Sequence, residues 1–413
     1  MIDRPYAERL DAADALAPFR ERFVIDDPEL IYLDGNSLGR LPLVTRDRLS
    51  GLAGEWGSHL VRGWHEWIDL PERIGDVLAT GVLGARRGEV IVADSTTVNL
   101  FKLAGAVLEA TPGAIVTDAG NFPTDRYVLD GLARLHGREL RLFDTDPIDG
   151  PQPGDVEREC AAGDVALVVL SHVAYRSGAL ADIEAINGAA APARVVWDLS
   201  HSAGAVPIEL DARGVELAVG CTYKYLNAGP GAPAYLHLRK DLQAELRTPI
   251  QGWFGQRDQF LMERPYDPAP GVRTFLAGTP PILALAGVEE GAKLVTEAGI
   301  ERLEEKARRL TELIVAIHDE RLAPLGFRLR SPRDPARRGA HVSIAHDQAW
   351  PICRALIERA KVIPDFRGPD SIRLGVPPLY TRFVDVYDAL ERLAALVERG
   401  DHRGVDDSPL RVT

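Results

Sequence analysis

The chain has 413 residues, of which 46% are hydrophobic and 26% charged, and this is enough for one large domain and a smaller one, each with its own core. Its formal net charge of -13 does not favour sequence-independent binding to nucleic acid phosphates or to anionic lipid. We therefore expect a small-molecule partner, and neither a nucleic acid nor a membrane.

The amino-terminal 23 residues carry charges in every turn and lack the unbroken apolar stretch of a signal peptide or a membrane helix. The three cysteines, Cys160, Cys221 and Cys353, are far apart and lack the paired spacing of a zinc site or a disulfide framework. These two features predict a cytoplasmic protein with reduced thiols and no metal site.

The segment 89–238 alternates short apolar runs with amphipathic stretches, which is typical of strands and helices in an α/β domain. The runs are apolar on both faces, as expected for mostly parallel strands that helices cover on both sides. Helices are expected between them, for example at 97–110 and 125–136. The seven candidate strands are 89–94, 114–119, 139–144, 165–172, 194–199, 215–220 and 234–239.

A long helical pattern over 282–320 follows this segment and leads to a second α/β segment, which predicts a smaller α/β C-terminal domain. Its candidate strands are 326–330, 340–346 and 371–376. The expected division of the chain is an N-terminal segment that packs with the small domain (1–50), a large domain (51–285) and the small domain (286–413).

Two polar side chains follow apolar runs where strands of the sheet are expected to end. Asp198 ends the strand at 194–199 and His201 follows three residues later, at the edge where open α/β sheets bind ligands, although a carboxylate there also fits a helix cap. Lys224 follows another apolar run and lies between the bulky Tyr223 and Tyr225. Partial desolvation lowers the pKa of such a lysine and makes it a nucleophile.

Pyridoxal phosphate requires a lysine for its aldehyde and a carboxylate at its pyridine nitrogen, and Lys224 and Asp198 are residues of these two kinds. Its phosphate could bind at the helix start after 89–94, where Thr96 and Thr97 offer hydroxyl and backbone N–H groups, although these residues equally fit a plain helix start. Phe122 could stack on the pyridine ring or belong to the core.

Together these segments resemble kynureninase, and the resemblance runs from IYLDGNSLGRLP near the start to IRLGVPPLY near the end. Its other pieces are DSTTVNLFK, NFPTD, WDLSHSAGAVP, and the more specific pair CTYKYLNAGPG and QGWFGQ. The resemblance implies the type I fold of the aspartate aminotransferase superfamily, with a mostly parallel seven-stranded sheet. It also implies a cytoplasmic homodimer that uses pyridoxal phosphate in tryptophan catabolism to hydrolyse L-kynurenine, or its 3-hydroxy derivative, to anthranilate, or 3-hydroxyanthranilate, and L-alanine.

Carried over to this chain, the family pattern makes Lys224 the Schiff-base lysine, Asp198 the partner of the pyridine nitrogen and Tyr223 a helper in proton transfer. His201 would lie near the ring hydroxyl, and Phe122 would stack on the ring. The further cofactor contacts that the resemblance implies are Thr96, Thr97, Asp125, Ser171, Tyr223, Trp253 and Thr279.

The resemblance also assigns substrate contacts. Arg373 would bind the α-carboxylate in a two-pronged ion pair, although a strand arginine is otherwise more often on the surface. Asn36 and Ser37 would belong to the substrate pocket. Trp64, with Gly278 nearby, would face the aromatic ring of the substrate and leave no polar partner for a ring hydroxyl, which implies a preference for L-kynurenine.

Other functions fit parts of the sequence. A cysteine desulfurase or a class V aminotransferase would share the fold, but desulfurases usually place histidine where this chain has Tyr223, and Cys353 lies in a predicted helix. The segment 35–39, GNSLG, matches the G-x-S-x-G pattern of serine hydrolases around Ser37, a pattern that requires a strand-to-helix elbow. A cofactor-binding protein without catalysis would need no carboxylate-binding arginine.

Overall fold

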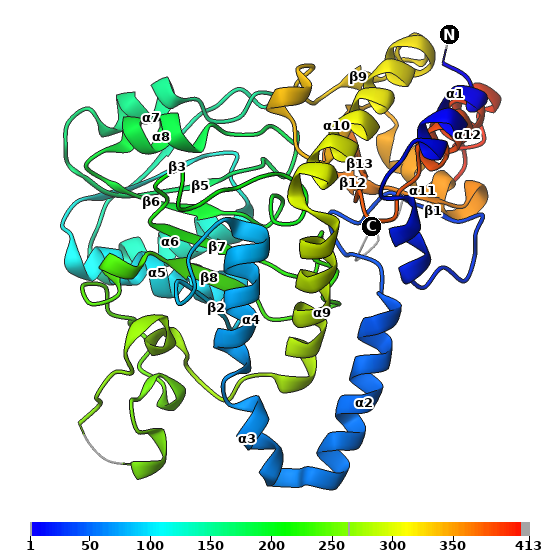
Figure 1. Cartoon of the computed structure of the whole chain (residues 1–413). Helices are drawn as coiled ribbons and strands as arrows, with labels where there is room; N and C mark the ends of the chain where they lie inside the picture. Colours follow the sequence, from blue (N-terminus) through cyan, green and yellow to red (C-terminus); the bar gives the residue numbers. More distant parts are fainter. Residues whose placement is uncertain (1, 263–264, 406–413) are drawn as a thin grey trace.

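The computed structural model describes residues 2–262 and 265–405 and contains one seven-stranded sheet in the order β2-β8-β7-β6-β5-β3-β4 (Figure 1). The pairings from β7 to β4 are parallel, whereas β8 is antiparallel to both of its neighbours. The predicted mostly parallel seven-stranded sheet is therefore confirmed. The strands are β2 (Val90–Val92), β3 (Ala114–Asp118), β4 (Leu140–Phe143), β5 (Val165–Ser171), β6 (Arg194–Asp198), β7 (Leu217–Gly220) and β8 (Tyr235–Leu238).

Helices cover both faces of this sheet because its central strands are apolar on both faces. Ile115 and Leu167 pack in one core with the inner sides of α5 and α6, while Val116 and Val168 pack in another core with α8, α4 and α9. Alternate residues of one strand thus serve two cores. The helices are α4 (Leu70–Leu78), α5 (Thr96–Ala110), α6 (Pro123–His136), α7 (Pro153–Cys160), α8 (Ile183–Ala190) and α9 (Ile282–Ala298).

The helical pattern over 282–320 is not one helix. It forms α9 and α10 (Ile300–Ile317), which Gly299 separates with a φ of +80°, and a short turn at His318–Leu322 follows. This left-handed conformation ends a helix and is accessible to glycine at little cost. Figure 1 shows both helices between the large sheet and the smaller one.

The smaller sheet has the strand order β12-β13-β10-β9, all antiparallel, and α11 (Ala349–Ala360) and α12 (Phe383–Arg399) pack with it. The three predicted strands of this segment are confirmed, but β12 was not predicted. Cys353 is buried in α11, which confirms the helix expected there. The strands are β9 (Arg328–Leu329), β10 (His341–Ala345), β12 (Asp365–Arg367) and β13 (Ser371–Gly375).

The N-terminal segment lies against the smaller sheet and its helices. Helix α1 (Arg4–Ala12) packs on α12, and the Asp11 carboxylate accepts the backbone N–H groups that begin α12, from Phe383 at 2.7 Å and Val384 at 3.0 Å. Strand β1 (Ile31–Tyr32) pairs with β11 (Val362–Ile363), and α2 (Leu43–His59) and the short α3 (Trp64–Trp67) follow. The boundaries at residues 50 and 285 stay a prediction.

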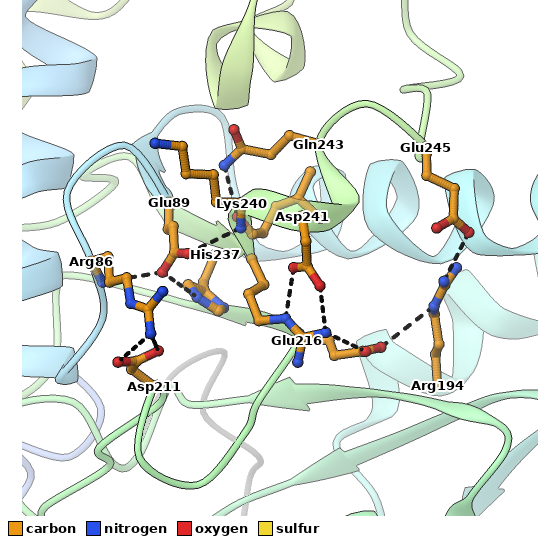
Figure 2. A network of polar contacts seen from close by, with 12 residues as sticks. Arg86, Glu89, Arg194, Asp211, Glu216, His237, Lys240, Asp241, Gln243 and Glu245 are labelled. Carbon is orange, nitrogen blue, oxygen red and sulfur yellow. Dashed lines mark hydrogen bonds and ion pairs between the residues drawn. The ribbon is translucent and has the colours of Figure 1, made fainter.

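A polar network holds the amino ends of the strands, opposite the edge at which parallel strands place ligand sites (Figure 2). The buried Glu89 accepts backbone N–H groups from Arg86 at 3.1 Å and Lys240 at 3.0 Å, and His237 Nε2 lies 3.7 Å from it. Burial alone would raise the pKa of Glu89, but these contacts together lower it. This network therefore stabilises the sheet at the edge opposite the one where parallel strands place ligand sites.

No helix within residues 2–262 and 265–405 is long and apolar enough to cross a membrane. In the same residues, no group of three or more His, Cys, Asp or Glu side chains is arranged to hold a metal ion.

Candidate functional site

A cavity of about 370 Å³ lies at the carboxyl edge of the large sheet. Residues that follow β2, β3, β5, β6 and β7 reach it, because these strands all run in the same direction. Its volume is in the range of small-molecule and cofactor sites. Nine of the eleven residues expected to contact the cofactor line it: Thr96, Thr97, Phe122, Asp125, Ser171, Asp198, His201, Tyr223 and Lys224.

The amine of Lys224 is at the centre of these residues. Its Nζ lies 3.2 Å from Nε2 of His201, 5.9 Å from the ring centroid of Phe122 and 6.0 Å from that of Tyr223. Burial lowers the pKa of Lys224, and the Arg373 guanidinium acts in the same direction. Burial also lowers the pKa of His201, and the neighbouring ammonium lowers it further. The lowered pKa of Lys224 favours an uncharged, nucleophilic amine.

Two carboxyl groups face this amine. Asp198, at the end of β6, accepts the backbone N–H of Ser200 at 2.8 Å. Asp125 is 1% exposed, and its Oδ2 has no hydrogen-bond partner among the described residues. Burial raises the pKa of Asp125, and repulsion from Asp198 and a hydrogen bond between the two side chains raise it further, which favours a protonated Asp125 that donates to Asp198.

The start of α5 also lines the cavity. Ser95 is the N-cap, because its hydroxyl accepts the Val98 N–H at 3.3 Å. The cap leaves Thr96 and Thr97 in the first turn, where backbone N–H groups have no partner within the helix. Ser95 is thus the helix cap and the threonines line the cavity, while their contact with a phosphate stays a prediction.

Phe122 is held in place by hydrogen bonds from its neighbours. The Ser171 hydroxyl donates to the side-chain oxygen of Asn121 at 2.7 Å, and the same oxygen accepts the Phe122 N–H at 2.8 Å. The ring of Phe122 then meets the ring of Tyr175 edge to face, 5.3 Å between centroids. Phe122 is only partly buried, so it is a wall of the cavity and not a core residue.

These residues fit pyridoxal phosphate. The low-pKa amine of Lys224 suits the aldehyde, and the carboxylate of Asp198 suits a protonated pyridine nitrogen. Asp125, which the raised pKa favours in its protonated form, can hydrogen-bond to Asp198 beside the ring. The ring of Phe122 offers a flat apolar surface, and the start of α5 offers N–H groups to a phosphate.

A second polar centre surrounds Arg373 on β13, which is 1% exposed and therefore not a surface arginine. Its Nη1 donates to the Tyr175 carbonyl at 2.7 Å, its Nη2 to the Ser37 hydroxyl at 2.9 Å, and its Nε to the side-chain oxygen of Asn36 at 2.7 Å. Asp365 forms an ion pair with Nη2. Because Tyr175 also packs on Phe122, this centre adjoins the Lys224 cavity.

The turn at residues 34–39 joins the two centres. It carries Asn36 and Ser37, and the N–H of Gly39 donates to the Tyr223 carbonyl at 2.8 Å. A Cβ on Gly39 would lie 2.4 Å from the Lys224 carbonyl oxygen, so only glycine allows this approach. Ser37 is in a turn after β1 with its hydroxyl on Arg373, not on a strand-to-helix elbow, so the serine hydrolase interpretation is wrong.

Four predicted residues belong neither to the Lys224 cavity nor to the Arg373 centre within this chain. Trp253, Gly278 and Thr279 are exposed, and their segments are adjacent, since a Cβ on Gly252 would lie 1.8 Å from the Ala277 carbonyl oxygen. Trp64 packs edge to face on Trp67 and beside Phe254, and it lines a separate apolar cavity of about 400 Å³.

The sequence did not single out Asn121, Tyr175, Asp34 or Asp365. Asn121 and Tyr175 act through a neighbouring residue or a backbone carbonyl, which no residue pattern reveals. Asp365 could have been found only from the register of β12 and β13, which places it opposite Arg373.

Sequence comparisons with known proteins find similarity to kynureninases. A sequence model described as the kynureninase C-terminal domain matches residues 303–393. Over 403 residues the chain is 42% identical to a kynureninase of Pseudomonas fluorescens, with 94% of each chain covered. Over 411 residues it is 41% identical to a kynureninase of Burkholderia pseudomallei (strain K96243), with 96% of each covered.

Solved structures of lower identity share the fold. An apo cysteine desulfurase from Thermococcus onnurineus NA1 is 19% identical with a TM-score of 0.76, covering 90% of this chain and 95% of that one. The cystine C–S lyase C-DES, in complex with cysteine persulfide, is 18% identical with a TM-score of 0.77, covering 89% and 98%. Another structure of C-DES carries glycine linked to its pyridoxal phosphate cofactor.

The pH dependence of stability is expected to change when Asp34 is replaced. Burial and repulsion from Asp365 raise the pKa of Asp34 to about 6. The folded chain therefore holds this proton between about pH 4 and pH 6 while the unfolded chain releases it, so stability is lost as pH rises through this window. We expect the free energy of unfolding of Asp34→Asn in urea to exceed that of the wild type by about 1–3 kcal/mol at pH 7 and to match it near pH 4.

The exposed Asp47 provides the control, since Asp47→Asn should leave the free energy of unfolding unchanged at both pH values. A difference between Asp34→Asn and the wild type that is the same at pH 4 and pH 7 would contradict the elevated pKa.

Proposed function

The chain belongs to the kynureninase family, and on that premise we propose that Lys224 is the residue that binds pyridoxal phosphate and moves the protons of the reaction. The protein is a pyridoxal phosphate-dependent enzyme that hydrolyses a carbon–carbon bond of L-kynurenine to give anthranilate and L-alanine. The observation that carries the residue assignment is the low-pKa amine of Lys224 in a cavity that also holds Asp198.

When bound, pyridoxal phosphate supplies an aldehyde for the substrate amine and a protonated ring that accepts electrons from the α-carbon. Asp198 keeps the proton on the pyridine nitrogen. The Lys224 Nζ would hold the cofactor aldehyde and, when free, would remove the α-proton and later return protons to carbon. Tyr223, beside the amine, is the second proton donor, and Arg373 holds the α-carboxylate so that the α-proton faces Lys224.

The cysteine desulfurase alternative is not supported by the position of its nucleophile. Cys353 is 1% exposed in the core of the smaller sheet and its helices, and burial raises the pKa of its thiol. A desulfurase needs an accessible thiolate that reaches the cofactor. The cysteine desulfurase structure is similar to this chain in fold, at 19% identity. The relatives that are 41–42% identical to this chain are kynureninases.

We propose that the active unit is a cytoplasmic homodimer with each site at the subunit boundary. Trp253 and Thr279, both expected to contact the cofactor, are exposed on adjacent segments of this chain, as they would be if they served the site of a second copy. The end of α2 and the residues after it expose Trp56 (57%), Leu60 (62%) and Val61 (77%) beside the Trp64 cavity. Such an apolar patch is typical of a subunit contact.

The Trp64 cavity supports a preference for L-kynurenine over its 3-hydroxy derivative. Its lining is apolar, with Leu52, Ile282 and Leu283 among its residues. A ring hydroxyl placed there would lose its water without gaining a hydrogen-bond partner. We expect kcat/KM for L-kynurenine to be about tenfold higher or more, and a preference for the hydroxylated substrate would contradict this role of Trp64.

Replacement of Lys224 tests the central assignment. The wild type should release anthranilate and alanine in equal amounts from L-kynurenine. We expect borohydride to fix one pyridoxal phosphate on the peptide that carries Lys224, detected by mass spectrometry. Lys224→Ala should lose this attachment, and its turnover should fall by about 10³-fold or more because the base is missing.

Lys293, an exposed lysine on α9, provides the matched control, and Lys293→Ala should keep both the attachment and the turnover. Attachment of the cofactor at another lysine in Lys224→Ala would refute the assignment.

Mixed dimers test the shared site. Lys224→Ala and Trp253→Ala should each be impaired alone, but together they should regain about a quarter of wild-type turnover, because half of the dimers are mixed and each has one intact site. Lys224→Ala mixed with Asp198→Ala should regain nothing, since both residues serve the same subunit's site. No recovery in the first mixture would count against the contribution of Trp253 to the neighbouring site.

A further inference from the structure

The guanidinium of Arg373 is almost fully engaged inside the protein. Asn36 accepts from Nε, Tyr175 from Nη1 and Ser37 from Nη2, while Asp365 pairs with Nη2. One hydrogen on Nη1 has no acceptor among the described residues. The Ser37 hydroxyl is a neutral partner on a turn, so an incoming carboxylate can replace it and bind Nη1 and Nη2 together.

Asp365 lies directly opposite Arg373 on the neighbouring strand, in the β12–β13 register. Side chains of such pairs lie on the same face and close together. Asp365 is 0% exposed and Arg373 is 1% exposed, so their ion pair is shielded from water and from salt. The contact can therefore fix the plane of the guanidinium more firmly than a surface pair could.

Arg367 adds a second positive charge beside the ion pair of Arg373 and Asp365. Its Nη2 lies 3.1 Å from the same oxygen of Asp365, so one carboxylate is shared between two guanidinium groups. Asp365 alone therefore does not neutralise the two guanidinium groups, and Asp34, which also interacts with Arg373, adds a second negative charge only as it ionises with a pKa of about 6.

We propose that Asp365 is a positioning residue for substrate recognition, which holds Arg373 so that its fork accepts the α-carboxylate in place of the Ser37 hydroxyl. The inference rests on the proposed role of Arg373. Asp365 would then decide how well the site selects α-amino acids over the corresponding amines. It would do so without touching the substrate itself.

The test compares L-kynurenine with kynuramine, which lacks the α-carboxylate. In Asp365→Asn we expect KM for L-kynurenine to rise by about 10- to 100-fold with a smaller, few-fold fall in kcat, because the misplaced fork loses mainly binding and only part of the orientation of the α-proton. The inhibition constant of kynuramine should stay within about twofold of the wild type, since this ligand makes no contact with the fork. An equal loss for both ligands would show a merely structural role, and unchanged values for both would overturn the proposal.

Asp370 supplies the control on the same sheet. It is partly exposed between β12 and β13 and pairs with Arg328 and Arg330, so Asp370→Asn should leave both constants unchanged. Should Asp365→Asn fold poorly, Asp365→Glu keeps the charge, and we expect it to show a smaller rise in KM with the same unchanged kynuramine constant.

A double-mutant cycle separates this proposal from the function it rests on. In an Arg373→Lys background, Asp365→Asn should raise KM by less than about threefold, because the group it positions is gone. Additive effects would mean that Asp365 acts independently of Arg373 and would overturn the proposal. If Arg373→Lys alone left KM unchanged, the assignment of Arg373 would fail, whereas wild-type anthranilate release tests the activity itself.

Discussion

The shared direction of β7, β6, β5 and β3 is the constraint on which the site depends. Parallel strands end at one edge, and the residues that follow each of them therefore meet there although they are up to about a hundred positions apart in the chain. Phe122, Ser171, Asp198 and Lys224 each come from a different strand end. The antiparallel β8 lets β2 run in the same direction, which brings the start of α5 to the same edge.

Bringing these groups together removes them from water, and the structure compensates with mutual contacts. Lys224 and His201 lie at hydrogen-bond distance, and the lowered pKa values of both favour their uncharged forms. Asp125 is expected to keep its proton beside Asp198. Desolvation thus prepares the amine and the acid at the same time, since both shifts have burial as their largest cause.

The sequence predicted what depends on local pattern. Apolar runs revealed all seven strands of the large sheet, and the lysine and aspartate at strand ends indicated the cavity. It did not predict the break at Gly299, where one glycine conformation divides a continuous helical pattern. Nor could it place Asp365 opposite Arg373, because strand register is a tertiary property. Trp253 and Thr279 were expected to contact the cofactor, but they are exposed outside the cavity of this chain, and no local pattern distinguishes these two positions.

The turn at residues 34–39 links the two halves of the chemistry within one short segment. Its Ser37 hydroxyl lies on Arg373, and its Gly39 N–H lies on the carbonyl next to Lys224. Gly39 has no room for a side chain there, so the turn cannot shift along the lysine segment without losing this contact. The backbone contact at Gly39 therefore fixes the turn against the lysine segment, and the turn holds the Ser37 hydroxyl at Arg373. The positions of Lys224 and Arg373 thus depend on the same short segment.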